Sequence, residues 1–406
     1  MSSAVTSGRE YAAVLTPDDS GPPTRASRAQ IPELTSIRGI AAIWVVLLHY
    51  NNDVAALFRE PAAVRRFMES GWLGVDVFFA LSGFVIAYNY ADSLRVFRAA
   101  TYREFLRARL ARIYPVHVAT LFALVPMIVV ARNLGARFDS QVYTPTQFVQ
   151  NLLLVHAWVP DFKLSWNYPS WSISVEWLLY LIFPILAILI GRLSDKKHTV
   201  LAIVLSTSAT ALLVPATINA PFHELIRGVP QFVTGCLIFR LRDQLRPFAW
   251  RSRSAVIWAL SIAAVVATQL PRVGLPVFLL IVPLLIATLA IPSGRDRFLC
   301  SEPMMLLGEV SYSLYMTHML VQKLVYGALP VAPWIGRSVV ARMGILLIYA
   351  ALLAAATGAC YVLIERPARR ALRRKKLSEI APELPQPPVE IAVGLRSSSD
   401  ADVSLH

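Results

Sequence analysis

An arginine and a histidine near opposite ends of the first apolar stretch have side chains suited to anion binding and to acid–base chemistry. The stretch reads LTSIRGIAAIWVVLLHY, in which Arg38 precedes His49 by eleven residues. On an α-helix this spacing corresponds to about 16 Å of rise and about three turns, so both side chains project from nearly the same face. Arginine matches phosphate geometry, and an imidazole can accept a hydroxyl proton near neutral pH. Taken alone, the pair is explained more simply as a topology marker and an interfacial histidine.

Ionisable residues also interrupt other apolar stretches. They are Asp76 in WLGVDVFFALSGFVI, Glu176 in PSWSISVEWLLYLIFP, Arg227, and His318 and Lys323 at SYSLYMTHMLVQK. An ionisable group within lipid is costly and is therefore a candidate functional residue. We expect His49, Asp76 and Glu176 to share the outer half of the bilayer. The alternative is mutual neutralisation, in which Asp76 or Glu176 pairs with Arg227 or Lys323 only to hold helices together.

A third cluster is basic and precedes the third apolar stretch. The segment FLRARLARIYP contains Arg107, Arg109 and Arg112. Arg109 and Arg112 are three residues apart and would share a helix face, which suits a phosphate-rich ligand. Arginines beside a membrane span also anchor topology and touch anionic lipid, and from charge alone that is the simpler interpretation.

The composition indicates that lipid surrounds the elements that carry these residues. Of 406 residues, 56% are apolar and only 16% are charged, whereas charged residues make up about 25% of soluble domains. The net charge of +14 does not indicate nucleic-acid binding, because the basic residues lie in short segments between apolar runs. The three cysteines lack metal-ligand spacing, so we expect neither a metal site nor a disulfide framework.

The pattern predicts an all-α integral membrane protein with about ten transmembrane helices and both termini cytoplasmic. The predicted spans lie near 34–50, 71–90, 113–131, 170–191, 199–217, 222–239, 254–270, 274–292, 305–326 and 338–364. The apolar segment 146–159 is too short to cross and reads as an interfacial or re-entrant helix. With this topology, 28 of the 39 Lys and Arg residues are cytoplasmic and nine are outside.

Three regions follow from this pattern. Residues 1–31 are predicted to be a disordered cytoplasmic tail, residues 32–367 a ten-helix membrane domain, and residues 368–406 a basic and then disordered cytoplasmic tail. Intramembrane ionisable residues also mark transport pathways, so a transporter or flippase for a polar solute is the alternative to an enzyme, and a non-catalytic scaffold is a third. No internal repeat is evident, which weakens the transporter hypothesis.

Six motifs in order resemble those of the acyltransferase 3 family of membrane acyltransferases. They are the first-span arginine and histidine, GVDVFFALSGF, RARLARIYP, SWSISVEWLLYLIFP, RGVPQFVTGCLIF and GEVSYSLYMTHMLV. The resemblance covers about residues 32–367. The acidic pair usual in the fourth-span motif is here Glu176 followed by Trp177, so only Glu176 can be carried over.

The resemblance implies transfer of an acyl group, most often acetyl, from cytoplasmic acyl-CoA to a hydroxyl of a sugar, glycan or related acceptor at the inner or plasma membrane. The family motifs map the catalytic histidine to His49 and CoA binding to Arg38, Arg109 and Arg112. Glu176 or Asp76 would orient the imidazolium or hold the sugar, and a covalent acyl-histidine is an open alternative to base catalysis. The remaining motif residues predicted to line the acceptor site are Trp171, Ser174, Arg227 and His318. The acyl length, the acceptor and the oligomeric state are left open by the sequence.

Overall fold

The computed structural model describes residues 30–135, 142–160, 162–193, 195–245, 253–271, 273–291, 296–328 and 332–371. Every regular element within these ranges is helical. The two tails predicted at the ends of the chain fall almost entirely outside the described residues.

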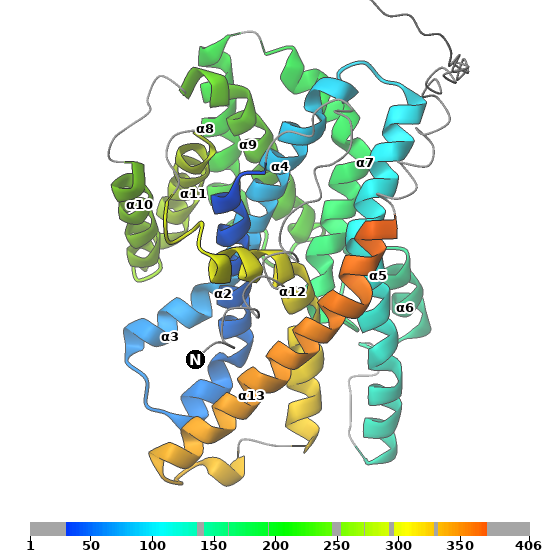
Figure 1. Cartoon of the computed structure of the whole chain (residues 1–406), viewed down its shortest axis with the longest axis vertical. Coiled ribbons are helices and arrows are strands. Elements are labelled where there is room, and N and C mark those ends of the chain that lie inside the picture. Colours follow the sequence, from blue (N-terminus) through cyan, green and yellow to red (C-terminus); the bar gives the residue numbers. More distant parts are fainter. Residues whose placement is uncertain are drawn as a thin grey trace, which may run out of the picture.

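Each of the ten predicted spans overlaps one of the described helices. These helices are α2 (Pro32–Leu57), α4 (Leu73–Leu94), α5 (Ala99–Asn133), α7 (Trp171–Gly191), α8 (Lys196–Ala216), α9 (His223–Leu245), α10 (Arg253–Ala267), α11 (Gly274–Ala290), α12 (Glu302–Ala328) and α13 (Val339–Cys360). The long helices α2, α4 and α12 form the centre, with α10 and α11 on one side and α5 and α7 on the other (Figure 1).

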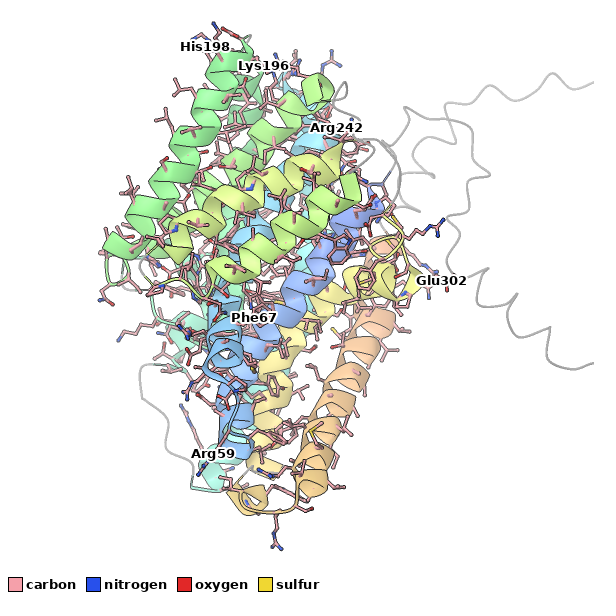
Figure 2. All side chains as sticks on the ribbon, turned by 90° about the vertical axis from the view of Figure 1, so that its left-hand side faces the viewer. Arg59, Phe67, Lys196, His198, Arg242 and Glu302 are labelled. Atoms are coloured by element: carbon pink, nitrogen blue, oxygen red, sulfur yellow. The ribbon has the colours of Figure 1, made fainter. Side chains whose placement is uncertain are left out.

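Within the described residues, six helical stretches are long and apolar enough to cross a membrane, as expected of a multi-pass membrane protein. These stretches are Pro32–Leu57, Ala62–Leu94, Ala99–Asn133, Tyr168–Gly191, Lys196–Ala216 and Val339–Ala371. The helices α10 and α11 are apolar but shorter, and α9 and α12 carry buried polar side chains. Ten crossings and cytoplasmic termini therefore stay predictions. Figure 2 shows Lys196, His198 and Arg242 at one end of the molecule and Arg59 at the opposite end.

The short apolar segment after α5 forms no long helix. It folds as α6 (Pro145–Leu152), an eight-residue helix, followed by a single 3-10 turn at His156–Trp158. The Thr144 side chain accepts a hydrogen bond from the backbone N–H of Gln147, which caps the helix, and Pro145 occupies its first turn. The prediction that this segment is no eleventh span is consistent with its length, and its place relative to the membrane stays a prediction.

Two glycines allow the central helices to pack backbone against backbone. A β-carbon at Gly308 of α12 would lie 2.1 Å from the carbonyl oxygen of Thr35 in α2, and one at Gly83 of α4 would lie 1.9 Å from that of Phe232 in α9. Such distances exclude any side chain at either position, so small residues set the separation of the helices, as they do at many membrane interfaces. The helices that carry the candidate residues are thereby held close together.

Candidate active site

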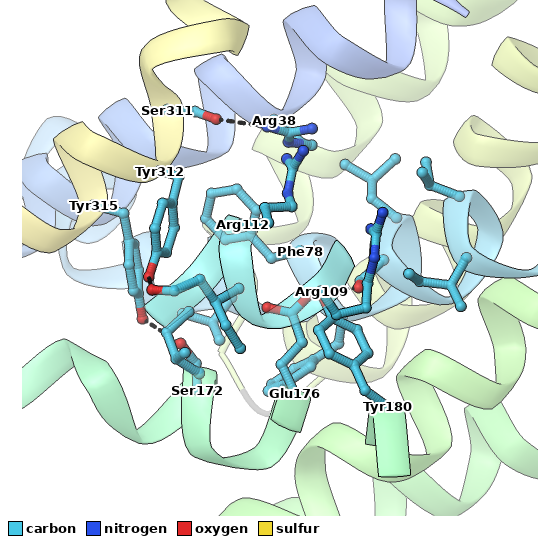
Figure 3. A pocket seen from close by; sticks show the side chains of 18 residues that line it. Arg38, Phe78, Arg109, Arg112, Ser172, Glu176, Tyr180, Ser311, Tyr312 and Tyr315 are labelled. Atoms are coloured by element: carbon cyan, nitrogen blue, oxygen red, sulfur yellow. Dashed lines mark hydrogen bonds between the residues drawn. The ribbon is translucent and has the colours of Figure 1, made fainter. Parts of the chain in front are cut away.

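The three arginines predicted to bind the donor line one cavity of about 110 Å³ together with Glu176. Its walls come from α2, α4, α5, α7 and α12 (Figure 3). The lining residues are Arg38, Val75, Phe78, Phe79, Leu81, Ser82, Val85, Ile86, Arg109, Arg112, Ile113, Ser172, Ile173, Glu176, Tyr180, Ser311, Tyr312 and Tyr315. Polar and charged groups thus share this cavity with an apolar wall.

Arg38 and Arg109 of the cavity form hydrogen bonds with neutral groups rather than with carboxylates. One Nη atom of Arg38 donates to the Ser311 hydroxyl at 3.2 Å and to the Gly308 carbonyl at 3.3 Å. Arg109 donates to the Tyr90 hydroxyl at 3.2 Å, and its buried Nε has no hydrogen-bond partner among the described residues. Charged donors in a buried site are stabilised by an anionic partner, so these arginines are available to a ligand.

The balance of charge around the cavity is positive. The positive charge of Arg112 is repelled by three neighbouring guanidinium groups, those of Arg38, Arg109 and Arg369. Arg369 is itself paired with the buried Glu365. The cavity lining therefore holds three cations against the single carboxylate of Glu176. An excess of positive charge that is partly shielded from water is costly unless an anion binds there.

Glu176 lies among the cavity residues and not beside His49. Its Oε1 accepts a hydrogen bond of 2.6 Å from Ser82 and another from the Tyr180 hydroxyl. Ser172, Glu176 and Tyr180 are four residues apart, so α7 presents them on one face along the cavity. The expectation that Glu176 shares the outer half of the bilayer with His49 stays a prediction.

Asp76 and Arg227 form a closed pair away from the cavity lining. The Arg227 guanidinium donates to both carboxylate oxygens of Asp76, at 3.0 Å and 2.8 Å, and to the Trp72 carbonyl at 2.6 Å. It also lies 4.7 Å from the Trp72 ring centre and 5.4 Å from that of Trp171. The pair is buried, with Asp76 at 1% and Arg227 at 8% exposure. This geometry matches the mutual neutralisation weighed from the sequence, and Lys323 instead donates to the Tyr143 hydroxyl at 2.9 Å.

His49 lies beside a second histidine. Its ring centre is 5.0 Å from that of the fully buried His318 in α12 and 5.3 Å from that of Tyr168. Arg38 and His49 both contact α12, so they do project from the same side of α2. The Tyr315 ring lines the cavity and lies 5.8 Å from His318, so the cavity and the histidine pair adjoin at Tyr315.

Of the three serines in the fourth-span motif, Ser172 lines the cavity, whereas Ser174, the one predicted for the site, does not. The Ser174 hydroxyl donates to the Leu154 carbonyl at 2.8 Å and accepts from the Ala157 N–H at 3.1 Å, which fastens the loop after α6. The Ser172 hydroxyl is 2.8 Å from that of Tyr315. Ser172 was not among the predicted site residues, although its spacing of four residues from Glu176 places it on the same helix face.

Ser311 and Tyr315 of α12 are two further cavity residues that were not predicted from the sequence. They lie four residues apart, and the predicted His318 follows three residues later on the same face of the helix. Among the described residues, no group of three or more His, Cys, Asp or Glu side chains is placed to hold a metal ion.

Several known proteins are similar to this chain in sequence. The acyltransferase MdmB of Streptomyces mycarofaciens is 28% identical over 386 residues, which cover 87% of this chain and 95% of the relative. The exopolysaccharide production protein ExoZ of Rhizobium meliloti is 28% identical over 272 residues, covering 64% and 80%. The peptidoglycan O-acetyltransferase OatA of Listeria monocytogenes is 23% identical over 323 residues, and this chain spans 50% of its length. No solved structure matches the chain.

A family model for the acyltransferase domain matches residues 31–365. That range contains every residue of the cavity and both His49 and His318. It favours the enzyme over the transporter. The chain therefore belongs to the acyltransferase 3 family and is a membrane acyltransferase.

Proposed function

We propose that the protein moves an acyl group, with acetyl as the first candidate, from cytoplasmic acyl-CoA to a hydroxyl of a sugar, glycan or related acceptor at the cell membrane. The observation that carries this proposal is the cavity with three arginines and one carboxylate, next to a histidine pair. Relatives named as O-acetyltransferases support acetyl transfer.

The donor fits the two kinds of surface in the cavity. Arg38, Arg109 and Arg112 would bind the 3′-phosphate and diphosphate of CoA, because guanidinium groups match phosphate oxygens in charge and geometry. The apolar walls from α4 and α5, including Val85 and Ile113, would accommodate the pantetheine arm. Fixing the phosphates at the arginine end directs the thioester toward Tyr315 and the histidines.

His49 would act as the general base for acyl transfer. The acceptor hydroxyl gives its proton to His49 while its oxygen attacks the thioester carbonyl carbon. As the new ester forms, the carbon–sulfur bond breaks, and the CoA thiolate leaves and takes the proton from His49. Tyr168, which is 36% exposed and packs its ring against His49, marks the side from which an acceptor would enter.

The carboxylates have separate roles in this proposal. Glu176 is the carboxylate of the active-site cavity and would hold Ser82 and Tyr180 in place beside the arginines. Asp76 and Arg227, with Trp171 packed against Arg227, would maintain the fold rather than bind the acceptor. Ser174 would likewise act on the loop after α6.

The test uses His49→Ala in purified protein reconstituted in lipid nanodiscs, with radiolabelled acetyl-CoA, and in cells by release of base-labile acetate from envelope glycans. We expect transfer to be lost and CoA binding to persist, because the phosphate site lies at the arginine end. The matched control is His198→Ala, an exposed histidine at the end of α8 (Figure 2). A correctly inserted His49→Ala variant that transfers acetyl at the normal rate would overturn the proposal.

A further inference from the structure

His318, the second histidine of the pair, is buried, and only one of its two ring nitrogens forms a hydrogen bond with a described residue. Its Nδ1 lies 2.7 Å from the carbonyl oxygen of Tyr315, and its Nε2 has no hydrogen-bond partner among the described residues. The side chain is fully buried. A buried polar atom without a partner costs free energy, so such an atom in a native site calls for an explanation.

The bonded nitrogen fixes the protonation of the free one. A carbonyl oxygen only accepts hydrogen bonds, so Nδ1 of His318 must carry the proton that is donated to Tyr315. In a neutral imidazole the other nitrogen then carries a lone pair and can only accept. His318 therefore presents a buried acceptor that requires an N–H or O–H donor.

His49 is the neighbour that can supply this donor. The two imidazole ring centres are 5.0 Å apart, inclined at 36°. The nearby Tyr315 hydroxyl is already engaged, since it donates to the Pro169 carbonyl at 2.9 Å. Two cross-helix hydrogen bonds also hold the histidine backbones together: Gln322 donates to the His49 carbonyl, and the Tyr50 hydroxyl donates to the His318 carbonyl.

We propose that His318 is a positioning residue for His49: in the reacting enzyme its Nε2 accepts an N–H of His49, a bond that the adjacent rings do not form in this structure. This bond fixes the His49 tautomer in which the second ring nitrogen carries the lone pair for the acceptor hydroxyl, and so rests on the proposed function of His49 as the base. When His49 takes the hydroxyl proton, its bond to Nε2 becomes charge-assisted. The proton then passes from His49 to the departing thiolate sulfur, and His318 neither gains nor loses one.

Two variants separate this role from a structural one. The His318→Asn side chain can still donate to the Tyr315 carbonyl but has no atom at the position of Nε2, whereas His318→Gln reaches that position with an amide oxygen. The first measurement is the rate at which diethyl pyrocarbonate modifies His49, followed by peptide mass spectrometry. This reaction needs neither the acyl donor nor the acyl acceptor. The second is base-labile acetate on envelope glycans. His198, in the same samples, serves as the internal standard.

We expect His318→Asn to slow modification of His49 and to lower acetate transfer by about 10- to 100-fold, the usual effect of losing a partner that orients a histidine. His318→Gln should recover most of both. The opposite ranking, with Asn active and Gln inactive, would show that the Tyr315 contact matters and would overturn the proposal. If His318→Asn does not fold, His318→Leu against His318→Gln makes the same comparison.

The double variant separates this inference from the proposed function. In a His49→Ala background, His318→Asn should reduce residual transfer no further. Loss of activity in His49→Ala with full activity in His318→Asn would remove His318 alone from the mechanism. Full activity in His49→Ala would remove the base itself.

Discussion

Two clusters of arginine and carboxylate within the same bundle, one buried and one half-buried, differ in how their charges are matched. Asp76 of α4 and Arg227 of α9 form a two-pronged ion pair, and the arginine also contacts the Trp72 carbonyl and two indole rings. Around the cavity, Arg38 and Arg109 instead contact hydroxyl and carbonyl groups. We call the first cluster closed, because its charges are matched within the protein, and the second open, because its arginines outnumber its single carboxylate.

This difference shows why an ionisable residue inside a membrane helix does not by itself identify a site. Asp76 and Glu176 both sit in apolar stretches, yet Asp76 is neutralised within the protein while Glu176 shares a cavity with an excess of cations. An anionic ligand gains little electrostatic attraction from a closed pair, but it stabilises an open cluster by balancing the excess positive charge. Each cluster should therefore respond differently when one member is removed.

The largest effect is expected on folding when the closed pair is broken. Asp76→Ala leaves Arg227 buried and uncompensated, which should cost about 3–5 kcal/mol of stability. The measurement is the midpoint of thermal unfolding and the yield of monodisperse protein in detergent. The double variant Asp76→Leu with Arg227→Met replaces both charges with apolar groups and should recover most of the loss. A wild-type midpoint in Asp76→Ala would mean that the pair does not stabilise the fold.

The next largest effect is expected on the affinity for the acyl donor and not on the stability of the fold. Arg112→Gln removes one cation from the open cluster, so CoA affinity should fall about 10- to 100-fold, the value of one or two charge-assisted hydrogen bonds. The unfolding midpoint without CoA should hold or rise, because repulsion among the arginines decreases. Isothermal titration with CoA measures this, with Arg107→Gln, an exposed arginine of the same helix, as the control. Equal losses in both variants would point to general surface charge instead of a specific site.

A smaller effect of opposite sign is expected at the carboxylate of the cavity. Glu176→Gln preserves partners for Ser82 and Tyr180 but removes a negative charge beside the arginines. CoA should then bind roughly tenfold more tightly, about 1.4 kcal/mol. The same titration tests this prediction. Weaker binding would indicate that the charge of Glu176 organises the arginines rather than opposing the phosphates.

The smallest effect is expected at the edge of the closed pair. Trp171→Phe replaces the indole ring next to the Arg227 guanidinium with a smaller ring, which should lower the stability by about 0.5–1 kcal/mol. The unfolding midpoint should fall by a few degrees while transfer kinetics stay unchanged. A raised KM for the acceptor with an unchanged midpoint would place Trp171 in the acceptor site.

Apolar length predicted which segments are helical but not where the helices end. The first predicted span ends at residue 50, whereas α2 continues to Leu57 and buries Asn51 and Asp53 against the protein. The third predicted span begins at residue 113, whereas α5 begins at Ala99. Hydropathy reports where lipid surrounds a helix, and helical hydrogen bonding continues beyond that region.

The site was predictable only where helical spacing within one segment defined it. The shared side of Arg38 and His49 follows from their separation along one helix. The choice of Asp76 rather than Glu176 as the partner of Arg227 does not, because these residues come from distant parts of the chain and only tertiary packing selects between them. The same holds for His318, whose position next to His49 depends on the packing of α12 against α2.

The glycine contact between α4 and α9 has a mechanical consequence. Main-chain atoms of the two helices meet at Gly83, so neither helix can slide or turn about its own axis without steric overlap. We therefore expect α4 and α9 to move as one rigid unit, which carries Ser82 on the cavity wall. Since α12 is held to α2 by the corresponding contact at Gly308, a widening that admits or releases a ligand is expected from α5, which contributes Arg109 and Arg112 to the cavity wall.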